Sequence, residues 1–493
     1  MRIKNIILYI SSLCLTLSSC DSDELLKVNE NPNVATSIDP DYLLGYAAYA
    51  WTGVRTGGDL YLPVGWANQA FSTGGNAGWG YAEDRYDISP FSTGNTWSGY
   101  FVSVGNNLNI AIEQAESAEP KNNNGAAQCK LVLANTMFEN TMIFGDIPFR
   151  QAWKADEFTS PVFDPQEQIL NDLLTMIDEA IAQIDITSVL KISNNDPYYK
   201  GDMEKWIKFG TSLKLKILMT MVDKDPSKAS DIGALVNSSE LITLSADNFE
   251  IDYYDETNSE NPKFKIFKNY AGGENPWVFA NTIGFTFMED RNDPRISIYF
   301  DANDNGDYLP VDTATEAALD TDANLLSSPI SVTKLWTADA PDLILSASEI
   351  QLLRAEIYAR GIGVTADLNM ANTLYKAGVK ESLVYYSVSE TDATTYVNGD
   401  LPDISTMSAS DAEKEIHIQQ WIDFQDRTLE GWINWRRSGP EGSEVPDLQL
   451  PPGAPAGGLF RRYTYPSDEL TSNKNAPSGA GDLKLHDNLW FDL

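Results

Sequence analysis

Apolar residues recur at the spacing of an α-helix in many parts of this chain. The clearest case follows Asp164-Pro165-Gln166-Glu167, where a residue that can cap a helix precedes a proline and a glutamate in the pattern of a capping box. The apolar positions that follow lie on one helical face: Leu170, Leu173, Leu174, Ile177, Ile181 and Ile184. This spacing predicts an amphipathic helix over 164–184.

The same periodicity and the same end signals predict further helices. They are a helix after Asp202, one from Ser346 to a stop at Gly361, one over roughly 366–382, one from a cap at Ser410 to 424, and three less regular helices over 41–54, 99–118 and 126–144. Several of them form pairs with short connections, as in tetratricopeptide-type stacks. The signature of that repeat is poor here, so this prediction rests on pairing and periodicity.

Long irregular segments separate these helices. Residues 57–98 are rich in glycine, serine, asparagine and aromatic residues, and 438–481 are dense in proline and glycine. Residues 251–343 contain one predicted strand, 296–300. Because no linker divides the chain, we expect residues 41–493 to form a single body of mainly α fold, with long loops and a few short strands.

The N-terminus has the pattern of a secretory signal. Arg2 and Lys4 precede the apolar run 6–17, which is too short to span a membrane, and Leu17-Ser18-Ser19-Cys20 follows. A cysteine at the cleavage point is typical of a lipoprotein, in which residues 1–19 are removed and Cys20 carries the lipid. Several acyl chains would then hold the protein durably on a membrane. The alternative is an ordinary signal with an incidental cysteine.

The segment after the predicted lipid is acidic. Asp21, Ser22, Asp23 and Glu24 open a tether over residues 20–40. This patch resembles the export signal that sends some Gram-negative lipoproteins to the outer surface of the outer membrane. A solvated, self-repelling tether is the plainer interpretation, and both can hold at once. We favour exposure on the cell surface over a periplasmic location.

Charge and cysteine usage narrow the possible functions. The formal net charge is −36, and removal of residues 1–19 deletes two cations, which makes it about −38 by the same counting rule. Such a chain repels phosphate backbones, so nucleic-acid binding is not expected. Once Cys14 is cleaved off and Cys20 is lipidated, Cys129 has no partner for a disulfide. The exported chain must therefore fold by burial of its apolar residues, which make up 42% of the sequence.

An ordered set of motifs runs through nearly the whole mature chain. In chain order the motifs are Asn29-Glu30-Asn31-Pro32-Asn33, Ile143-Phe144-Gly145-Asp146-Ile147-Pro148-Phe149, Tyr199-Lys200-Gly201-Asp202, Asp293-Pro294-Arg295, Leu345 to Ile350, Gly431 to Gly439 and Arg462-Tyr463-Thr464-Tyr465-Pro466. This set resembles the SusD/RagB family of nutrient-binding outer-membrane lipoproteins, and in particular its SusD-like branch with the Phe-Gly-Asp-Ile-Pro element. The set is specific, although no single motif is diagnostic.

The resemblance implies a fold, a partner and an activity. It implies a mainly α fold of tetratricopeptide-like helix pairs that sits as a lid on a SusC-like, TonB-dependent β-barrel transporter and captures glycans or peptides at the cell surface. The motif residues themselves are interpreted as scaffold. Gly145 and Pro148 punctuate a turn, for example, and Trp432 with Arg436 can form a cation–π pair.

Ligand contacts are expected in the variable loops, because sugar sites combine exposed aromatic rings with short polar side chains. Two regions fit, 66–101 and the glycine-rich segment around Trp277. The candidate ligand-binding residues are Trp66, Gln69, Phe71, Trp79, Tyr81, Arg85 and Trp277. Arg85 would matter most for an acidic or peptidic cargo, because a guanidinium can fork onto a carboxylate. The alternative is that these rings pack the loops onto the helices.

One segment has the spacing of a calcium loop. Asp301, Asn303, Asn305, Asp307 and Asp312 occupy ligand positions of that pattern, with Gly306 at the turn. However, Asp312 replaces the usual glutamate, and a predicted strand rather than a helix precedes the loop. An Asn-Gly pair also makes an ordinary hairpin turn, so both interpretations stay open. No other cofactor is expected.

Catalytic signatures are sparse. The only histidines, His417 and His486, have no metal-ligand partner at helical spacing, and the sequence contains no nucleophile elbow, Walker loop or cysteine cluster. We therefore expect a binding protein without catalysis. Two alternatives remain open: a surface glycoside hydrolase whose carboxylate pair is hidden among 71 acidic residues, and a lipid-anchored adhesion or scaffold protein.

Replacement of Cys20 by alanine tests the predicted anchor. The variant lacks the thiol that would carry the acyl chains, so we expect it to leave the membrane pellet for the soluble fraction. Cell fractionation followed by immunoblotting measures this change. Continued sedimentation of Cys20→Ala with outer membranes would show that the anchor assignment is wrong.

Overall fold

The computed structural model describes residues 38–73, 82–270, 278–314, 325–455 and 457–493, and Pro40–Leu493 form one compact unit. The predicted signal, Cys20 and nearly all of the acidic tether therefore lie outside the described residues. Among the described helices, none is long and apolar enough to cross a membrane.

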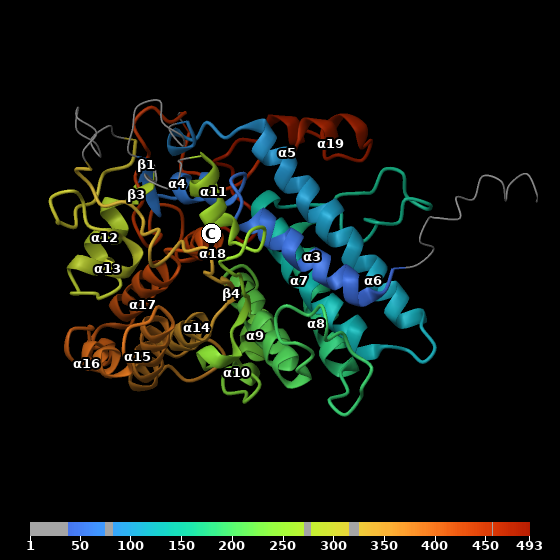
Figure 1. Cartoon of the computed structure of the whole chain (residues 1–493), viewed down its shortest axis with the longest axis horizontal. Helices are drawn as coiled ribbons and strands as arrows, with labels where there is room; N and C mark the ends of the chain where they lie inside the picture. Colours follow the sequence, from blue (N-terminus) through green and yellow to red (C-terminus); the bar gives the residue numbers. More distant parts are fainter. Residues whose placement is uncertain (1–37, 74–81, 271–277, 315–324, 456) are drawn as a thin grey trace, which may run out of the picture. The chain divides into compact units, whose positions relative to one another are not determined.

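The first part of the body is a series of helices packed each on the next (Figure 1). They are α3 (Pro40–Arg55), α6 (Asn106–Ser117), α7 (Asn123–Phe144), α8 (Gln166–Gln183) and α9 (Met203–Met221). The central helix, α7, is buried on nearly all sides, and Cys129 is a free thiol within it. The helices predicted over 41–54, 126–144, 164–184 and after Asp202 are confirmed. The one predicted over 99–118 is α6 preceded by the π-helix η2 (Gly99–Gly105).

The second part contains the helix pair α14 (Ala347–Arg360) and α15 (Leu368–Tyr385), followed by α16 (Glu390–Gly399), α17 (Ala409–Asp423) and α18 (Thr428–Arg437). The predicted ends of α14 are confirmed: the Ser346 hydroxyl accepts the N–H of Glu349, and Gly361 stops the helix with φ +73°. α14 also packs on α17 and contacts α9, so it joins the two parts. The cap of α17 is Ser408, two residues before the predicted one.

Short elements complete the unit. The helices are α4 (Tyr61–Ala67), α5 (Pro90–Ser98), α10 (Ala229–Leu235), α11 (Pro262–Tyr270), α12 (Thr282–Glu289), α13 (Ile296–Tyr299) and α19 (Ser467–Ser472), with 3-10 turns at η1 (Glu83–Arg85), η3 (Pro226–Lys228), η4 (Ser245–Asp247), η5 (Ile404–Thr406) and η6 (Ala480–Asp482). Two antiparallel sheets are described, each of two strands: β1 (Phe71–Thr73) with β3 (Val278–Ala280), and β2 (Phe249–Ile251) with β4 (Asp342–Leu345). The prediction of a mainly α fold with long loops and short strands is confirmed.

Two local predictions were wrong. The segment predicted as a strand over 296–300 is the short helix α13, because the turn before it is closed by the Asp293 carboxylate, which accepts the N–H of Arg295. Asp164 does not cap α8. Its carboxylate accepts the N–H groups of Phe149 and Arg150, and Asp146 accepts the N–H of Gln166 at the start of the helix instead.

The tryptophan and arginine motif of α18 is buried, as the scaffold interpretation predicts. The Arg436 guanidinium lies 3.7 Å from the centre of the Trp432 ring, which confirms the cation–π pair. Arg437 makes a different contact: it binds the Glu356 carboxylate through two hydrogen bonds of 2.9 and 2.8 Å.

Glu356 belongs to a group of buried charges around α14. Burial is the largest single effect and disfavours its charged form, but the charge and hydrogen bonds of Arg437, together with other neighbouring groups that include Arg360, outweigh burial and hold the pKa of the carboxyl below its usual range. Two turns earlier, Glu349 lies 2.9 Å from the Lys216 ammonium and 2.7 Å from the Arg427 guanidinium. Carboxylates of one helix therefore hold cations of its neighbours.

Replacement of Glu356 by glutamine keeps the shape of the side chain and removes its charge. Arg437 would then be buried without its anionic partner, and we expect the free energy of unfolding to fall by roughly 3–5 kcal/mol. Urea denaturation at pH 7 measures this loss. Asp178→Asn, at an exposed pair with Lys214, is the matched control and should cost no more than about 1 kcal/mol. Equal small losses for both variants would contradict the role given to Glu356.

Candidate functional site

The two regions predicted to bind ligand start from neighbouring strands. β1 ends at Thr73 and β3 begins at Val278, and these two residues are paired in the antiparallel register. Trp79, Tyr81 and Trp277 lie outside the described residues. The described ends that flank 74–81 and 271–277 are thus adjacent, although about 200 residues of sequence separate them.

The described chain that ends at Ala314 reaches the same place as the ends of β1 and β3. The Asp84 carboxylate accepts the N–H of Ala314 at 2.7 Å and also interacts with the backbone N–H of Thr73. The Arg85 guanidinium donates to the carbonyl oxygen of Ala314, again at 2.7 Å. We call this group the loop platform and define it by Gln69, Thr73, Asp84, Arg85, Val278 and Ala314.

The backbone is strained around the loop platform. Gln69, Tyr86 and Ala314 adopt positive φ angles of 61°, 65° and 58°, in the left-handed region that non-glycine residues rarely occupy. Each such residue costs of the order of 1–3 kcal/mol and persists only where the surroundings hold it. Five further non-glycine residues of the described chain also have positive φ, so this strain does not locate the ligand site, which stays a prediction.

Asp84 carries the unusual electrostatics of the platform. Its side chain is buried, and burial raises its pKa to about 7, against the opposing effects of the Ala314 N–H and the Arg85 charge. The sequence did not identify Asp84 or Ala314 as site residues. No local pattern shows that an aspartate in a charged triplet will be buried against a residue 230 positions away.

The other predicted residues of this region form the floor of the platform. Trp66, Gln69 and Phe71 are buried, and the Phe71 ring packs against the rings of Trp66, Tyr61 and Trp336. Arg85 is half-buried. The rings of Trp66 and Phe71 thus pack the loop onto the body, as the alternative interpretation describes. A direct contact of these residues with ligand stays a prediction.

The predicted calcium loop is held by its own turns. The side-chain oxygen of Asn303 accepts the N–H groups of Asn305 and Asp307, and the carboxylates of Asp301 and Asp312 accept hydrogen bonds from hydroxyl groups elsewhere. Within the described part of the chain, no group of three histidine, cysteine or acidic side chains is placed to hold a metal ion. Calcium binding stays a prediction, and a turn closed by the Asn303 side chain accounts for the described contacts.

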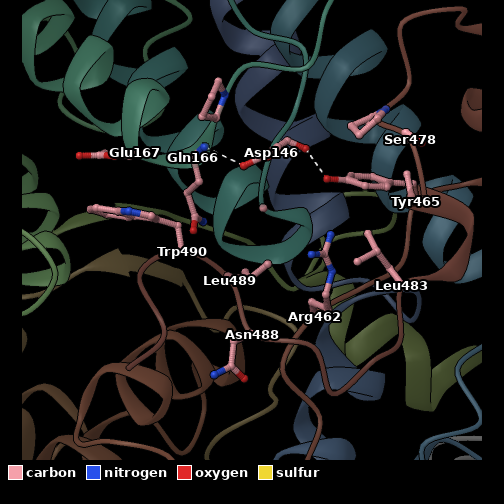
Figure 2. Close-up of a pocket in the computed structure, with 15 residues that line it drawn as sticks. Asp146, Gln166, Glu167, Arg462, Tyr465, Ser478, Leu483, Asn488, Leu489 and Trp490 are labelled. Atoms are coloured by element: carbon pink, nitrogen blue, oxygen red, sulfur yellow. Dashed lines mark hydrogen bonds between the residues drawn. The ribbon is translucent and has the colours of Figure 1, made fainter.

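A pocket of about 450 Å³ lies beside the Phe-Gly-Asp-Ile-Pro turn (Figure 2). The Asp146 carboxylate accepts the N–H of Gln166, and the Tyr465 hydroxyl donates to the backbone oxygen of Asp146, as the dashed lines in Figure 2 show. The Arg462 guanidinium lies over the Tyr465 ring and donates to the carbonyl oxygen of Phe144. These contacts fasten the turn to the C-terminal segment, so we interpret this pocket as structural.

Comparisons with known proteins identify relatives of the whole body. The sequence profile of the SusD-like family, described as "Starch-binding associating with outer membrane", matches residues 68–466. No curated protein sequence matches this chain.

Solved structures resemble the fold at low sequence identity. One is described as a chitin-binding protein, with 20% identity, a TM-score of 0.75 and coverage of 92% of this chain and 100% of its own. A SusD homologue from Bacteroides uniformis has 22% identity, a TM-score of 0.74 and coverage of 92% and 99%. A chitin-binding SusD homologue from Flavobacterium johnsoniae has 19% identity, a TM-score of 0.72 and the same coverage.

The raised pKa of Asp84 predicts how stability depends on pH. The folded state keeps the Asp84 proton up to about pH 7, whereas the unfolded state loses it near pH 4, so this group favours folding less as pH rises through 7. Between pH 6 and 8 the loss is about 1.4 kcal/mol. Asp84→Asn should remove this component of the pH dependence, as measured by urea denaturation of both proteins across that range. Parallel curves for wild type and variant would contradict the assignment.

Proposed function

This chain belongs to the SusD-like family, and we propose that it is a surface-exposed outer-membrane lipoprotein that binds a nutrient oligosaccharide and delivers it to a SusC-like, TonB-dependent transporter. The observation that carries this proposal is the family match over residues 68–466, whose description joins starch binding to the outer membrane. The protein holds its ligand and performs no catalysis.

A glycan is the favoured cargo. Two of the similar solved structures are described as chitin-binding, and the family description names starch. Aromatic rings and short polar side chains, which dominate the loops of this chain, suit the flat faces and hydroxyl groups of sugars. A peptide is the alternative cargo, for which Arg85 would bind a carboxylate.

The ligand binds at the loop platform in this proposal. Trp79, Tyr81 and Trp277 supply rings for stacking, and the buried Trp66 and Phe71 support the floor. The strained residues Gln69, Tyr86 and Ala314 fix the backbone of the described residues beside these segments. Such preorganisation lowers the entropy lost on binding.

A lipid on Cys20 attaches the protein to the membrane. The chain offers a signal over residues 1–19 and the acidic tether 20–40 for this purpose. Several acyl chains supply durable attachment without a membrane-spanning helix. Surface exposure follows from the acidic patch behind Cys20.

The surroundings of Asp84 support binding without hydrolysis. A glycosidase needs two carboxyl groups that face the scissile bond. Asp84 is buried, and one of its oxygens accepts the N–H of Ala314, so this carboxyl is not presented to a sugar. A surface hydrolase would have to use other acidic residues.

A pull-down of the tagged, lipidated protein from outer membranes in mild detergent tests the proposal. We expect mass spectrometry to recover a large β-barrel transporter with the wild type. The variant Trp79→Ala/Tyr81→Ala should still recover the transporter but bind oligosaccharides about tenfold more weakly, because it loses two stacking rings. Calorimetry with malto- and chito-oligosaccharides measures that loss, and thermal unfolding confirms that the fold is intact.

Two results would contradict this proposal. Recovery of the lipoprotein alone across several detergents would remove the transporter as a partner. Turnover of a polymer by the purified protein would favour the surface hydrolase, and binding of a protein partner without any affinity for sugars or peptides would favour an adhesion protein.

A further inference from the structure

A second cavity, of about 950 Å³, lies against the outer side of α3 and contains none of the residues of the loop platform. Its other walls are the loop before α9 and the segment after β2. Aromatic and polar side chains from all three elements line it: Tyr42, Tyr46, Tyr49, Asn195, Lys200 and Tyr254. We call it the tyrosine cavity.

The tyrosine rings are exposed although the helix that carries three of them is a core element. Tyr42, Tyr46 and Tyr49 are 66, 57 and 48% exposed, and Tyr254 is 54% exposed. On α3 the three tyrosines follow the i, i+4, i+7 spacing of one helical face, which extends about 10.5 Å along the axis. The opposite face of α3 is buried in the core. Grouped exposed rings of this kind mark binding surfaces.

The wall opposite α3 is held rigidly by Asp196. This buried carboxylate accepts hydrogen bonds of 2.8–3.2 Å from the N–H groups of Tyr198, Tyr199 and Gly201, the Trp206 indole and the Gln128 amide. The wall is also tied directly to α3, because Asp41 accepts the N–H of Asn195 at 2.7 Å. The cavity is therefore built before any ligand arrives.

Glycine and tyrosine packing set the width of the cavity. A Cβ at Gly45 would lie 2.9 Å from the Cβ of Asn195, so only glycine lets the wall approach α3 this closely. The Tyr49 ring is held edge-on by Tyr253, with 6.1 Å between ring centres. Burial, with the neighbouring Tyr254 and Asp252, raises the pKa of the Tyr49 hydroxyl, which therefore stays a hydrogen-bond donor.

We propose that the tyrosine cavity is a second oligosaccharide-binding site, which takes a neutral sugar chain laid along α3. The spaced rings of Tyr42, Tyr46 and Tyr49 stack on successive sugar faces, because sugars present C–H groups to aromatic rings. The Asn195 amide and the charged ends of Lys200 and Asp252 border the rings and bind hydroxyl groups.

The charge of the protein selects a neutral ligand. Lys200 is the single cation among the residues that line the cavity, and Asp252 and Asp196 lie on the same walls. With a formal net charge of −36 on the chain, an anionic polysaccharide would be repelled. The site goes beyond the proposed function: it gives the protein two contacts with one long chain, and so a higher avidity for polymers than for short oligosaccharides.

Calorimetric titration with neutral hexasaccharides (maltohexaose, cellohexaose and chitohexaose) tests the second site. We expect at least one of them to bind wild type with two sites per protein. Tyr42→Ala/Tyr46→Ala should lose one site or weaken it at least about tenfold, because two stacking rings are gone. Tyr42→Phe/Tyr46→Phe, which keeps both rings, is the matched control and should retain both sites. The exposed positions of these residues leave the fold unchanged, which thermal unfolding verifies.

This experiment distinguishes the site at the loop platform from the site in the tyrosine cavity. Trp79→Ala/Tyr81→Ala should remove the other site only. Unchanged stoichiometry and affinity in Tyr42→Ala/Tyr46→Ala, or no binding of any hexasaccharide to wild type, would overturn the tyrosine cavity as a sugar site. Loss of the transporter from the pull-down with this variant, while its sugar binding equals that of wild type, would also overturn it and identify the rings as a protein contact.

Discussion

The pairing of buried charges around α14 is the interaction on which the helical body depends. Glu349 and Glu356 lie two turns apart and hold cations that come from α9, from the residue before α18, and from the end of α18. A buried charge without a partner costs far more than the pair, so none of these helices can shift alone. Cys129, the free thiol of the described body, contributes no cross-link. Such contacts constrain an arrangement of helices that disulfides fix in other proteins.

A body constrained in this way can support backbone strain around the loop platform. The left-handed conformations of Gln69, Tyr86 and Ala314 oppose folding, and the packing of Trp66 and Phe71 beneath them offsets that cost. Trp66 and Phe71, which the sequence predicts as ligand contacts, therefore help to hold the platform. Aromatic residues in a glycine-rich loop have two uses, and composition does not separate them. For Phe71 the structure shows the packing role, because the residue is paired between β1 and β3 and its ring is fully buried.

The sequence predicted best what is encoded locally. The helix that begins at Asp202 and the one from Ser346 to Gly361 have caps and stops within their own turns, and the structure has both. The errors arose where a hydrogen-bonding group outside the predicted element decides the local structure. Asp164 has the right spacing for a cap, but the turn at Phe149 and Arg150 takes its carboxylate. Four of the five residues over 296–300 are β-branched or aromatic, yet the Asp293 turn just before them starts a helix there. No sequence pattern predicted that Asp84 is buried, because its hydrogen-bond partner Ala314 lies 230 residues away.

The sequence contains a pattern that indicates the tyrosine cavity, namely the spacing of the tyrosines on α3. The helix over 41–54 was predicted, and within it the leucines and alanines share one face while Tyr42, Tyr46 and Tyr49 share the other. Large aromatic residues grouped on the solvent face of a core helix are typical of binding surfaces. The residues predicted to bind ligand lie in glycine-rich loops and not on this helix. A site on a helix loses less entropy on binding, because its rings are already in place. In the proposal for the tyrosine cavity, the helix and the loops each hold part of one sugar chain, which raises the avidity for polymers.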